Sequence, residues 1–225
     1  MTEITVINGG SAGLEGSHYA VLLGGDWRKL PEAVRKRFGR PIAHGGARAY
    51  RGRVLATELS TAGRIVAWLA RVVGGPMPFC AGAVGASMVA VTEVAGFGAD
   101  GVRAQVWTRS YARPGAFPQL VQSAKCFTGP TGLEERLGYG LVMQLAVRAE
   151  GEAGAADLVF TSKAHLLRFG RLEVRLPDWL SPGHCEIRHR DEGGGAFTFT
   201  LTITHALLGR LVHQVARYRD VAEEE

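Results

Sequence analysis

The segment from Ala196 to His205 reads Ala-Phe-Thr-Phe-Thr-Leu-Thr-Ile-Thr-His, an alternation of apolar residues and threonines. Because successive side chains of a β-strand point to opposite faces, the apolar side chains share one face and the threonines share the other. This pattern is typical of an antiparallel sheet that buries one face. The apolar face consists of Phe197, Phe199, Leu201 and Ile203.

Strand-like segments occupy most of the remaining chain, and glycine is about twice as frequent as usual, with 31 residues in 225. Many of these glycines fall between predicted strands, where they allow tight turns and bends. We therefore expect an α+β domain, mainly β, built on a highly curved antiparallel sheet or incomplete barrel of about nine or ten strands. Eleven strand-like segments are the candidates for these strands: 51–59, 87–95, 102–111, 119–128, 133–137, 139–149, 157–169, 171–176, 184–190, 196–205 and 211–218.

Two short helices are expected in the N-terminal half. Residues 30–39 carry a proline and a glutamate at the start and a glycine at the end. Residues 61–73 place Ile65, Trp68, Leu69 and Val72 on one stripe, which we expect to face the core, with an interfacial membrane role as the alternative. We divide the chain into a leader (1–20), one domain (21–220) and an acidic tail (221–225).

Composition excludes several classes of protein. The charge excess is small, 26 − 21 = +5, and without a basic block it does not predict nucleic-acid binding. The leader lacks the basic and apolar regions of a secretory signal, and no apolar segment approaches a membrane span, so we expect a cytoplasmic protein. Three scattered cysteines, Cys80, Cys126 and Cys185, predict buried thiols. A glycine turn at 8–13 lacks the context of a nucleotide site.

Seven short motifs follow one another from residue 22 to residue 218 in an order and spacing that resemble the bacterial domain-of-unknown-function family 4166. This family is also found fused behind saccharopine-dehydrogenase-like reductases. The resemblance implies no particular activity, but the fusion implies small-molecule metabolism and a reductase as a partner. The motifs are Leu-Gly-Gly-Asp-Trp-Arg-Lys-Leu-Pro (23–31), Gly-Arg-Val (52–54), the helix end at 69–76, Val-Trp-Thr-Arg (106–109), Leu-Glu-Glu-Arg-Leu-Gly (133–138), Leu-Pro-Asp-Trp-Leu (176–180) and Leu-Gly-Arg-Leu-Val-His (208–213).

A curved sheet or barrel offers an interior cavity lined by the apolar rows of its strands. We expect this chain to bind a hydrophobic or amphipathic small molecule, with or without cofactor-free acid–base chemistry of an isomerase or cyclase, and we expect neither a cofactor nor a metal. One alternative is a non-catalytic accessory domain that docks on a reductase or another partner. The other is a lipid carrier that contacts the membrane surface through the helix at 61–73.

The first candidate catalytic group is the histidine pair His205 and His213. A hairpin centred on Gly209 would place the two imidazoles opposite each other on one face, where they could relay protons or, with His184 or Glu186, hold a metal. A two-residue turn would instead oppose His205 to Val212.

The second candidate is the carboxylate pair Glu134 and Glu135. Neighbouring residues of a strand face opposite sides, so only one of the two can line a cavity. We name Glu134 as the candidate acid or base, because burial in a barrel would raise its pKa.

The expected ligand-binding residues come from three strands. On the first, Arg103, Trp107 and Arg109 share a face that is suited to an anionic or aromatic ligand, although the same face could point to solvent. The other two strands contribute apolar residues. These are Tyr139, Leu141, Met143 and Phe199.

Overall fold

The computed structural model describes residues 17–43, 46–71, 77–78, 85–98, 100–138 and 140–221. The glycine turn at 8–13, Cys80, Tyr139 and most of the acidic tail therefore lie outside the described residues.

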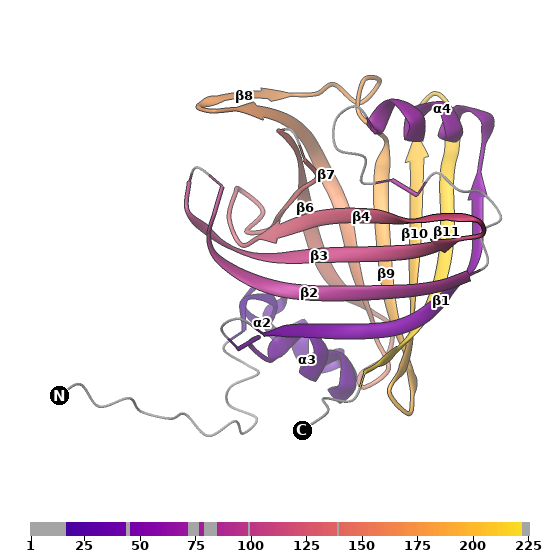
Figure 1. Cartoon of the computed structure of the whole chain (residues 1–225). Coiled ribbons are helices and arrows are strands. Elements are labelled where there is room, and N and C mark those ends of the chain that lie inside the picture. The colour runs from indigo at the N-terminus through magenta and orange to yellow at the C-terminus, as the bar shows by residue number, and fades with distance from the viewer. Residues whose placement is uncertain are drawn as a thin grey trace.

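Eleven strands form one antiparallel sheet, and ten of them close into a barrel (Figure 1). The ring runs β6-β5-β4-β3-β2-β1-β11-β10-β9-β7 and closes where β7 pairs with β6, while β8 pairs with β7 outside the ring. The mainly β, strongly curved fold is confirmed, and the barrel is closed. The strands are β1 (Ala47–Leu59), β2 (Gly85–Phe97), β3 (Val102–Arg113), β4 (Ala116–Cys126), β5 (Glu134–Arg136), β6 (Leu141–Glu150), β7 (Asp157–Phe169), β8 (Leu172–Arg175), β9 (His184–Gly193), β10 (Ala196–His205) and β11 (Gly209–Asp220).

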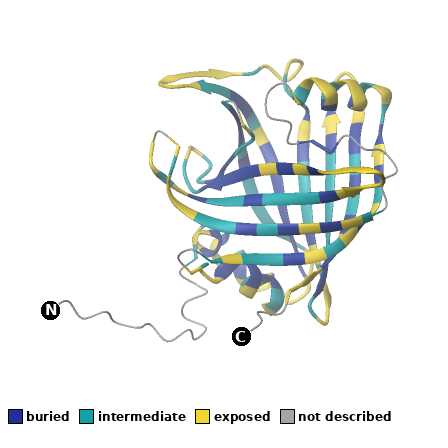
Figure 2. Ribbon diagram, viewed as in Figure 1, coloured by how far each residue is buried: buried dark blue, intermediate teal, exposed yellow. Residues whose placement is uncertain are grey.

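The residues on each strand alternate between the barrel interior and its outer wall, as the banding of Figure 2 shows. On β10 the predicted apolar face points inward: Phe197 is fully buried, and Phe199 and Ile203 face the interior. The alternation of apolar residues and threonines in the sequence therefore correctly identifies the face of β10 that points into the barrel.

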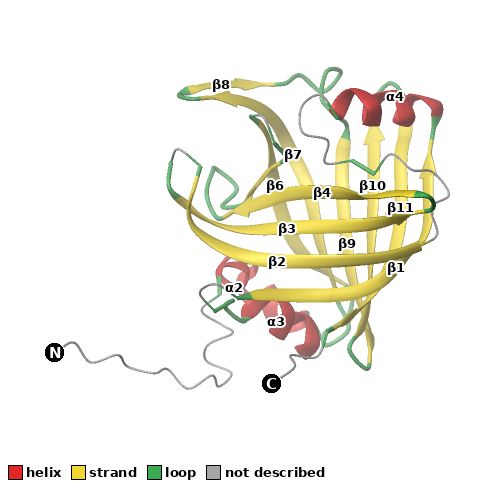
Figure 3. Cartoon of the chain, in the orientation of Figure 1, coloured by secondary structure: helices red, strands yellow, loops and turns green. Residues whose placement is uncertain are grey.

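One end of the barrel is covered by helices α2 (His18–Leu23) and α3 (Glu32–Gly39), joined by the 3-10 helix η1 (Gly24–Lys29) (Figure 3). Ser17 begins α2 by accepting a hydrogen bond from the Ala20 N–H. The side chains of Tyr19 in α2, Trp27 in η1 and Phe38 in α3 are buried. The predicted helix at 30–39 is confirmed as α3, whereas α2 was not expected, and it begins inside the segment that we assigned to the leader.

Helix α4 (Thr61–Ala70) lies at the opposite end and confirms the second predicted helix. Its orientation contradicts the prediction, because the stripe that we expected to face the core is exposed. Ile65 is 57% exposed, Trp68 63% and Leu69 53%. The buried face carries the small residues Gly63 and Ala67 instead.

A close backbone approach explains this inversion. A β-carbon on Gly63 would lie 2.0 Å from the Leu211 carbonyl oxygen, so only glycine fits at this contact. The same carbonyl accepts a hydrogen bond from the Ser60 N–H, and Ser60 Oγ accepts one from the Gly63 N–H at the start of α4. Small residues therefore lie at this contact, and Ile65, Trp68 and Leu69 are left largely exposed.

Candidate ligand cavity

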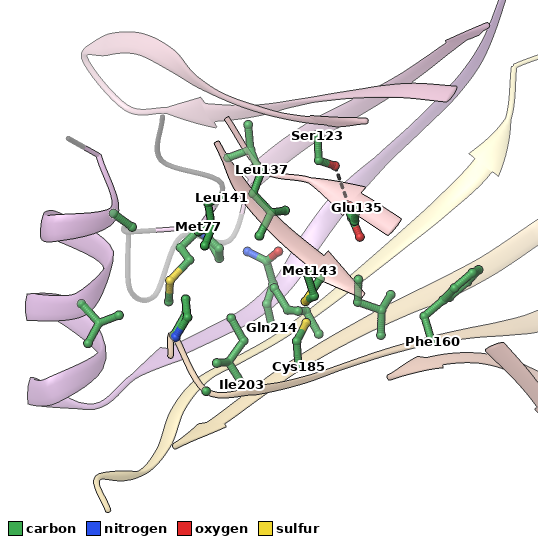
Figure 4. Close-up of a pocket in the computed structure, with 18 of the residues that line it drawn as sticks. Met77, Ser123, Glu135, Leu137, Leu141, Met143, Phe160, Cys185, Ile203 and Gln214 are labelled. Atoms are coloured by element: carbon green, nitrogen blue, oxygen red, sulfur yellow. Dashed lines mark hydrogen bonds between the residues drawn. The ribbon is translucent and has the colours of Figure 1, made fainter. Parts of the chain in front are cut away.

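The barrel encloses a cavity of about 590 Å³. This volume lies within the range of sites that hold small organic ligands, about 300–1,000 Å³. Figure 4 shows its apolar wall, with Met77 beside α4, Phe160 toward the opposite end, and Leu141, Met143 and Ile203 between them.

A charged cluster on β3, β4 and β5 interrupts this apolar wall. Glu135 Oε1 accepts a hydrogen bond of 2.6 Å from the Ser123 hydroxyl. Glu135 Oε2 lies 2.9 Å from Lys125 Nζ, and the two groups form an ion pair whose angles are not those of a hydrogen bond. Arg109 donates a hydrogen bond of 3.1 Å to Ser123 Oγ, and its second terminal nitrogen lies 3.8 Å from Glu135 Oε1. The four side chains form one network inside the barrel.

The protonation states of this cluster follow from its contacts. Burial raises the pKa of Glu135, but Lys125, Arg109 and the hydrogen bond from Ser123 outweigh burial and hold that pKa below its usual value. Burial lowers the pKa of Lys125, Glu135 opposes that shift and Arg109 adds to it. Glu135 is therefore an ionised carboxylate at neutral pH.

Aromatic rings surround the lysine of this cluster. Lys125 Nζ lies 5.4 Å from the Trp107 ring centroid and 5.5 Å from that of Phe160, within the range of cation–π attraction. Phe38 of α3 packs against both rings. The charged cluster thus lies near the end of the barrel that α2 and α3 cover.

The opposite end carries a rim of exposed apolar side chains that continue into the cavity. These side chains are more than half exposed and also line the cavity. They come from α4, which contributes Leu69, from the loop between β8 and β9, and from the turn between β10 and β11. These loop and turn residues are Trp179, Leu180, Leu207 and Leu208. We call this set, together with Ile65 and Trp68, the apolar rim.

Five of the seven predicted ligand-binding residues line the cavity: Trp107, Arg109, Leu141, Met143 and Phe199. The structure thereby places the Trp107 and Arg109 face of β3 inside the barrel. Arg103, on the same face, lies beyond the cavity: its side chain is 61% exposed and forms an ion pair with Glu93. Tyr139 lies outside the described residues.

The two neighbouring carboxylates do face opposite sides, but the one in the cavity is Glu135 and not Glu134. Glu134 is buried on the other face of β5, where both of its oxygens accept hydrogen bonds from Arg168. Alternation alone cannot decide which of two adjacent carboxylates points inward.

Both predicted registers of the histidine hairpin are wrong. His205 lies opposite Gly209, and His213 lies opposite Thr202. The cause is the short turn at 206–208, which pairs His205 directly with Gly209. Farther along the hairpin Leu211 is the extra residue of a β-bulge, because Ile203 pairs with Val212 while Thr204 pairs with Arg210. The bulge shifts the register by one residue, so His205 and His213 lie on opposite faces of the sheet.

Each histidine has its own local partners. Nδ1 of His205 accepts hydrogen bonds from the N–H groups of Leu207 and Leu208, so its Nε2 carries the proton and donates to the Trp179 carbonyl. His205 lines the cavity, and its imidazole links the turn to the Trp179 loop. His213 lies 3.0 Å from the Thr202 hydroxyl and does not line the cavity.

Two cavity groups, Lys125 and Ser123, were missed from the sequence, although they follow Val121 at intervals of two on β4. A lysine in such a row is typical of a solvent-facing strand, and only closure of the barrel turns it inward. Two of the predicted buried thiols, Cys126 and Cys185, are confirmed, and burial raises the pKa of the Cys185 thiol in the cavity wall to about 12.

Two negative findings concern only the residues that the structure describes. Within those ranges, no three His, Cys, Asp or Glu side chains come together in a way that could hold a metal ion. In the same part of the chain, no helix is both long and apolar enough to span a membrane.

Comparison with known proteins agrees with the resemblance seen in the sequence. Residues 30–217 match the family described as a domain of unknown function, DUF4166. A search of curated proteins gives no match. The match covers α3, α4 and nearly the whole barrel, and the chain therefore belongs to the DUF4166 family.

Proposed function

We propose that this protein binds an amphipathic small molecule inside its barrel. The cavity of about 590 Å³, apolar except for one charged cluster and a few isolated polar groups, is the observation that carries the proposal. An apolar wall favours a hydrocarbon body through burial of apolar surface, and the cluster of Arg109, Lys125 and Glu135 offers partners to a polar group.

Displacement of a neutral apolar dye, N-phenylnaphthylamine, tests this proposal. Ala216 lines the cavity and is buried, so Ala216→Phe places a ring in the space of the ligand. We expect the unaltered chain to bind the dye with enhanced fluorescence and Ala216→Phe to lose at least about tenfold in affinity. Ala95→Phe is the matched control, because Ala95 is an exposed residue of β2, and we expect this variant to keep its affinity for the dye. Equal binding by all three chains would place the dye outside the barrel and overturn the proposal.

The apolar rim favours a second candidate function, a carrier that collects its ligand at an anionic membrane surface. Large apolar side chains in solvent are costly unless they meet a partner, and this rim is continuous with the cavity. Helix α4 presents the exposed Arg64 and carries no carboxylate, which suits lipid phosphates. A bilayer could exchange an amphiphile through this opening.

Flotation with phosphatidylglycerol vesicles tests the carrier function. We expect the unaltered chain to float and Trp68→Ser to float several-fold less. Leu120→Ser is the control, because Leu120 is about as exposed as Trp68 but lies on β4, apart from the rim. Absence of flotation by the unaltered chain, or equal loss with both variants, would exclude the rim as a membrane contact.

The expected isomerase or cyclase chemistry and the reductase partner stay predictions. If acid–base chemistry occurs in the cavity, its carboxylate is Glu135, which lies with Lys125 in the cavity wall.

A further inference from the structure

The charges inside the barrel do not balance. The cavity cluster contains two cationic side chains, Arg109 and Lys125, and one carboxylate, Glu135. An arginine stays protonated in proteins. Burial and Arg109 lower the pKa of Lys125, and the ion pair of 2.9 Å with Glu135 opposes that shift. With the lysine protonated, the cluster carries a net charge of 2 − 1 = +1 in a wall that is otherwise largely apolar.

We infer that the ligand carries a single anionic group, a carboxylate, which Arg109 binds. This inference rests on the proposed function and names the chemical class of its ligand. An unbalanced charge in an apolar cavity is costly, and an anion in contact with it removes much of that cost. A monoanion is the charge that brings this cluster to neutrality.

Arg109 is the cation that is available to a ligand. Lys125 is nearly fully buried, and its ammonium pairs with Glu135 between the Trp107 and Phe160 rings. Arg109 is 20% exposed toward the cavity, and the one hydrogen bond that it makes among the described residues goes to Ser123. Its guanidinium has five N–H donors in a planar fork, so most of them are left for a ligand.

The geometry of the fork favours a carboxylate. A guanidinium and a carboxylate are both planar and can form two parallel hydrogen bonds, which a hydroxyl cannot do. In Figure 4, Ser123 and Glu135 lie toward the Phe160 end of the cavity, whereas Met77 lies beside α4. A ligand held by Arg109 therefore points its anionic group away from α4 and extends its hydrocarbon body toward the apolar rim.

A matched pair of ligands tests this inference. Laurate and lauryl alcohol have the same hydrocarbon chain and differ in the charged group, and each is titrated against bound N-phenylnaphthylamine. We expect laurate to bind at least about tenfold more tightly than the alcohol, the ratio that a charge-assisted hydrogen bond supplies. Arg109→Gln abolishes this ratio and leaves the affinity for the alcohol nearly unchanged.

Arg103→Gln is the matched control, because Arg103 lies on the same strand and face but outside the cavity; it keeps the ratio. Arg109→Lys keeps the positive charge but lacks the planar guanidinium, so we expect it to reduce the ratio of the laurate and alcohol affinities. This variant provides a second measurement if Arg109→Gln does not fold. Equal affinities for acid and alcohol in the unaltered chain would overturn the inference and leave the proposed function standing. Failure of both ligands to displace the dye would overturn the proposed function itself.

Discussion

The two ends of the barrel use large apolar residues in opposite ways. At the end covered by α2 and α3, Tyr19, Trp27 and Phe38 are buried, and Trp27 is only 2% exposed. At the α4 end, Trp68 is 63% and Leu207 76% exposed. The difference follows from what each helix packs against. Helix α3 fills the barrel end with Phe38, whereas α4 approaches the Leu211 backbone so closely that only small residues fit beneath it.

A closed barrel can therefore be sealed at one end and left open at the other by short helices, and here the more apolar helix, α4, lies at the open end. The sealed end contributes to stability and brings Phe38 close to the charged cluster. The open end contributes little packing and presents the apolar rim. Stability and ligand entry should therefore respond to mutations at different ends.

The largest expected effect separates two tryptophans. Trp27→Ala removes a fully packed side chain and should lower the free energy of unfolding by about 3–5 kcal/mol. Trp68→Ala removes an exposed one and should change it by less than about 0.5 kcal/mol. Urea denaturation measures both values. Similar losses at the two positions would show that α4 is packed as tightly as the covered end.

A pH titration of stability compares a histidine near each end. Burial lowers the pKa of His165 in the cavity wall to about 4, with His184 adding to the shift and Asp178 opposing it. Burial and Arg37 lower the pKa of His189, which packs against Phe38, to about 3, against a smaller opposing effect of Asp157. Both side chains are neutral when folded, and the unfolded chain takes up protons below pH 6.5.

Stability should therefore fall as the pH drops below 6.5, by about 2 kcal/mol for each histidine at about pH 5. His165→Gln and His189→Gln should each remove about half of this pH dependence, whatever they do to stability at neutral pH. Urea denaturation at a series of pH values measures the slope. An unchanged slope in His165→Gln would show that this imidazole is accessible to water through the open end.

The next effect concerns the contact that turns the stripe of α4 outward. Gly63→Ala forces the helix away from the Leu211 carbonyl and should cost about 1–3 kcal/mol. Gly25→Ala in η1 is the control, because nothing lies within 4 Å of the added β-carbon and the backbone there is not left-handed. The control should be neutral or slightly stabilising, by about 0.4–1 kcal/mol. Thermal unfolding compares the two, and a harmless Gly63→Ala would remove our explanation for the exposed stripe.

Most of the fold could be predicted from the sequence, because alternation and glycine turns are local signals. Every predicted strand appears, and five expected ligand-binding residues line the cavity. Three features depend on contacts between distant residues. The outward stripe of α4 depends on the Leu211 carbonyl. The placement of His205 and His213 on opposite faces depends on the bulge at Leu211, and the inward side of Glu135 depends on the pairing of β5 with β4 and β6.

A crystal structure of the chain grown with laurate tests the central claim most directly. We predict elongated density inside the barrel, with the carboxylate at Arg109 and the far end of the hydrocarbon chain beside Leu69 of the apolar rim. An interior filled by the chain's own side chains, or laurate that enters past α3 with its hydrocarbon end beside Phe38, would contradict the account.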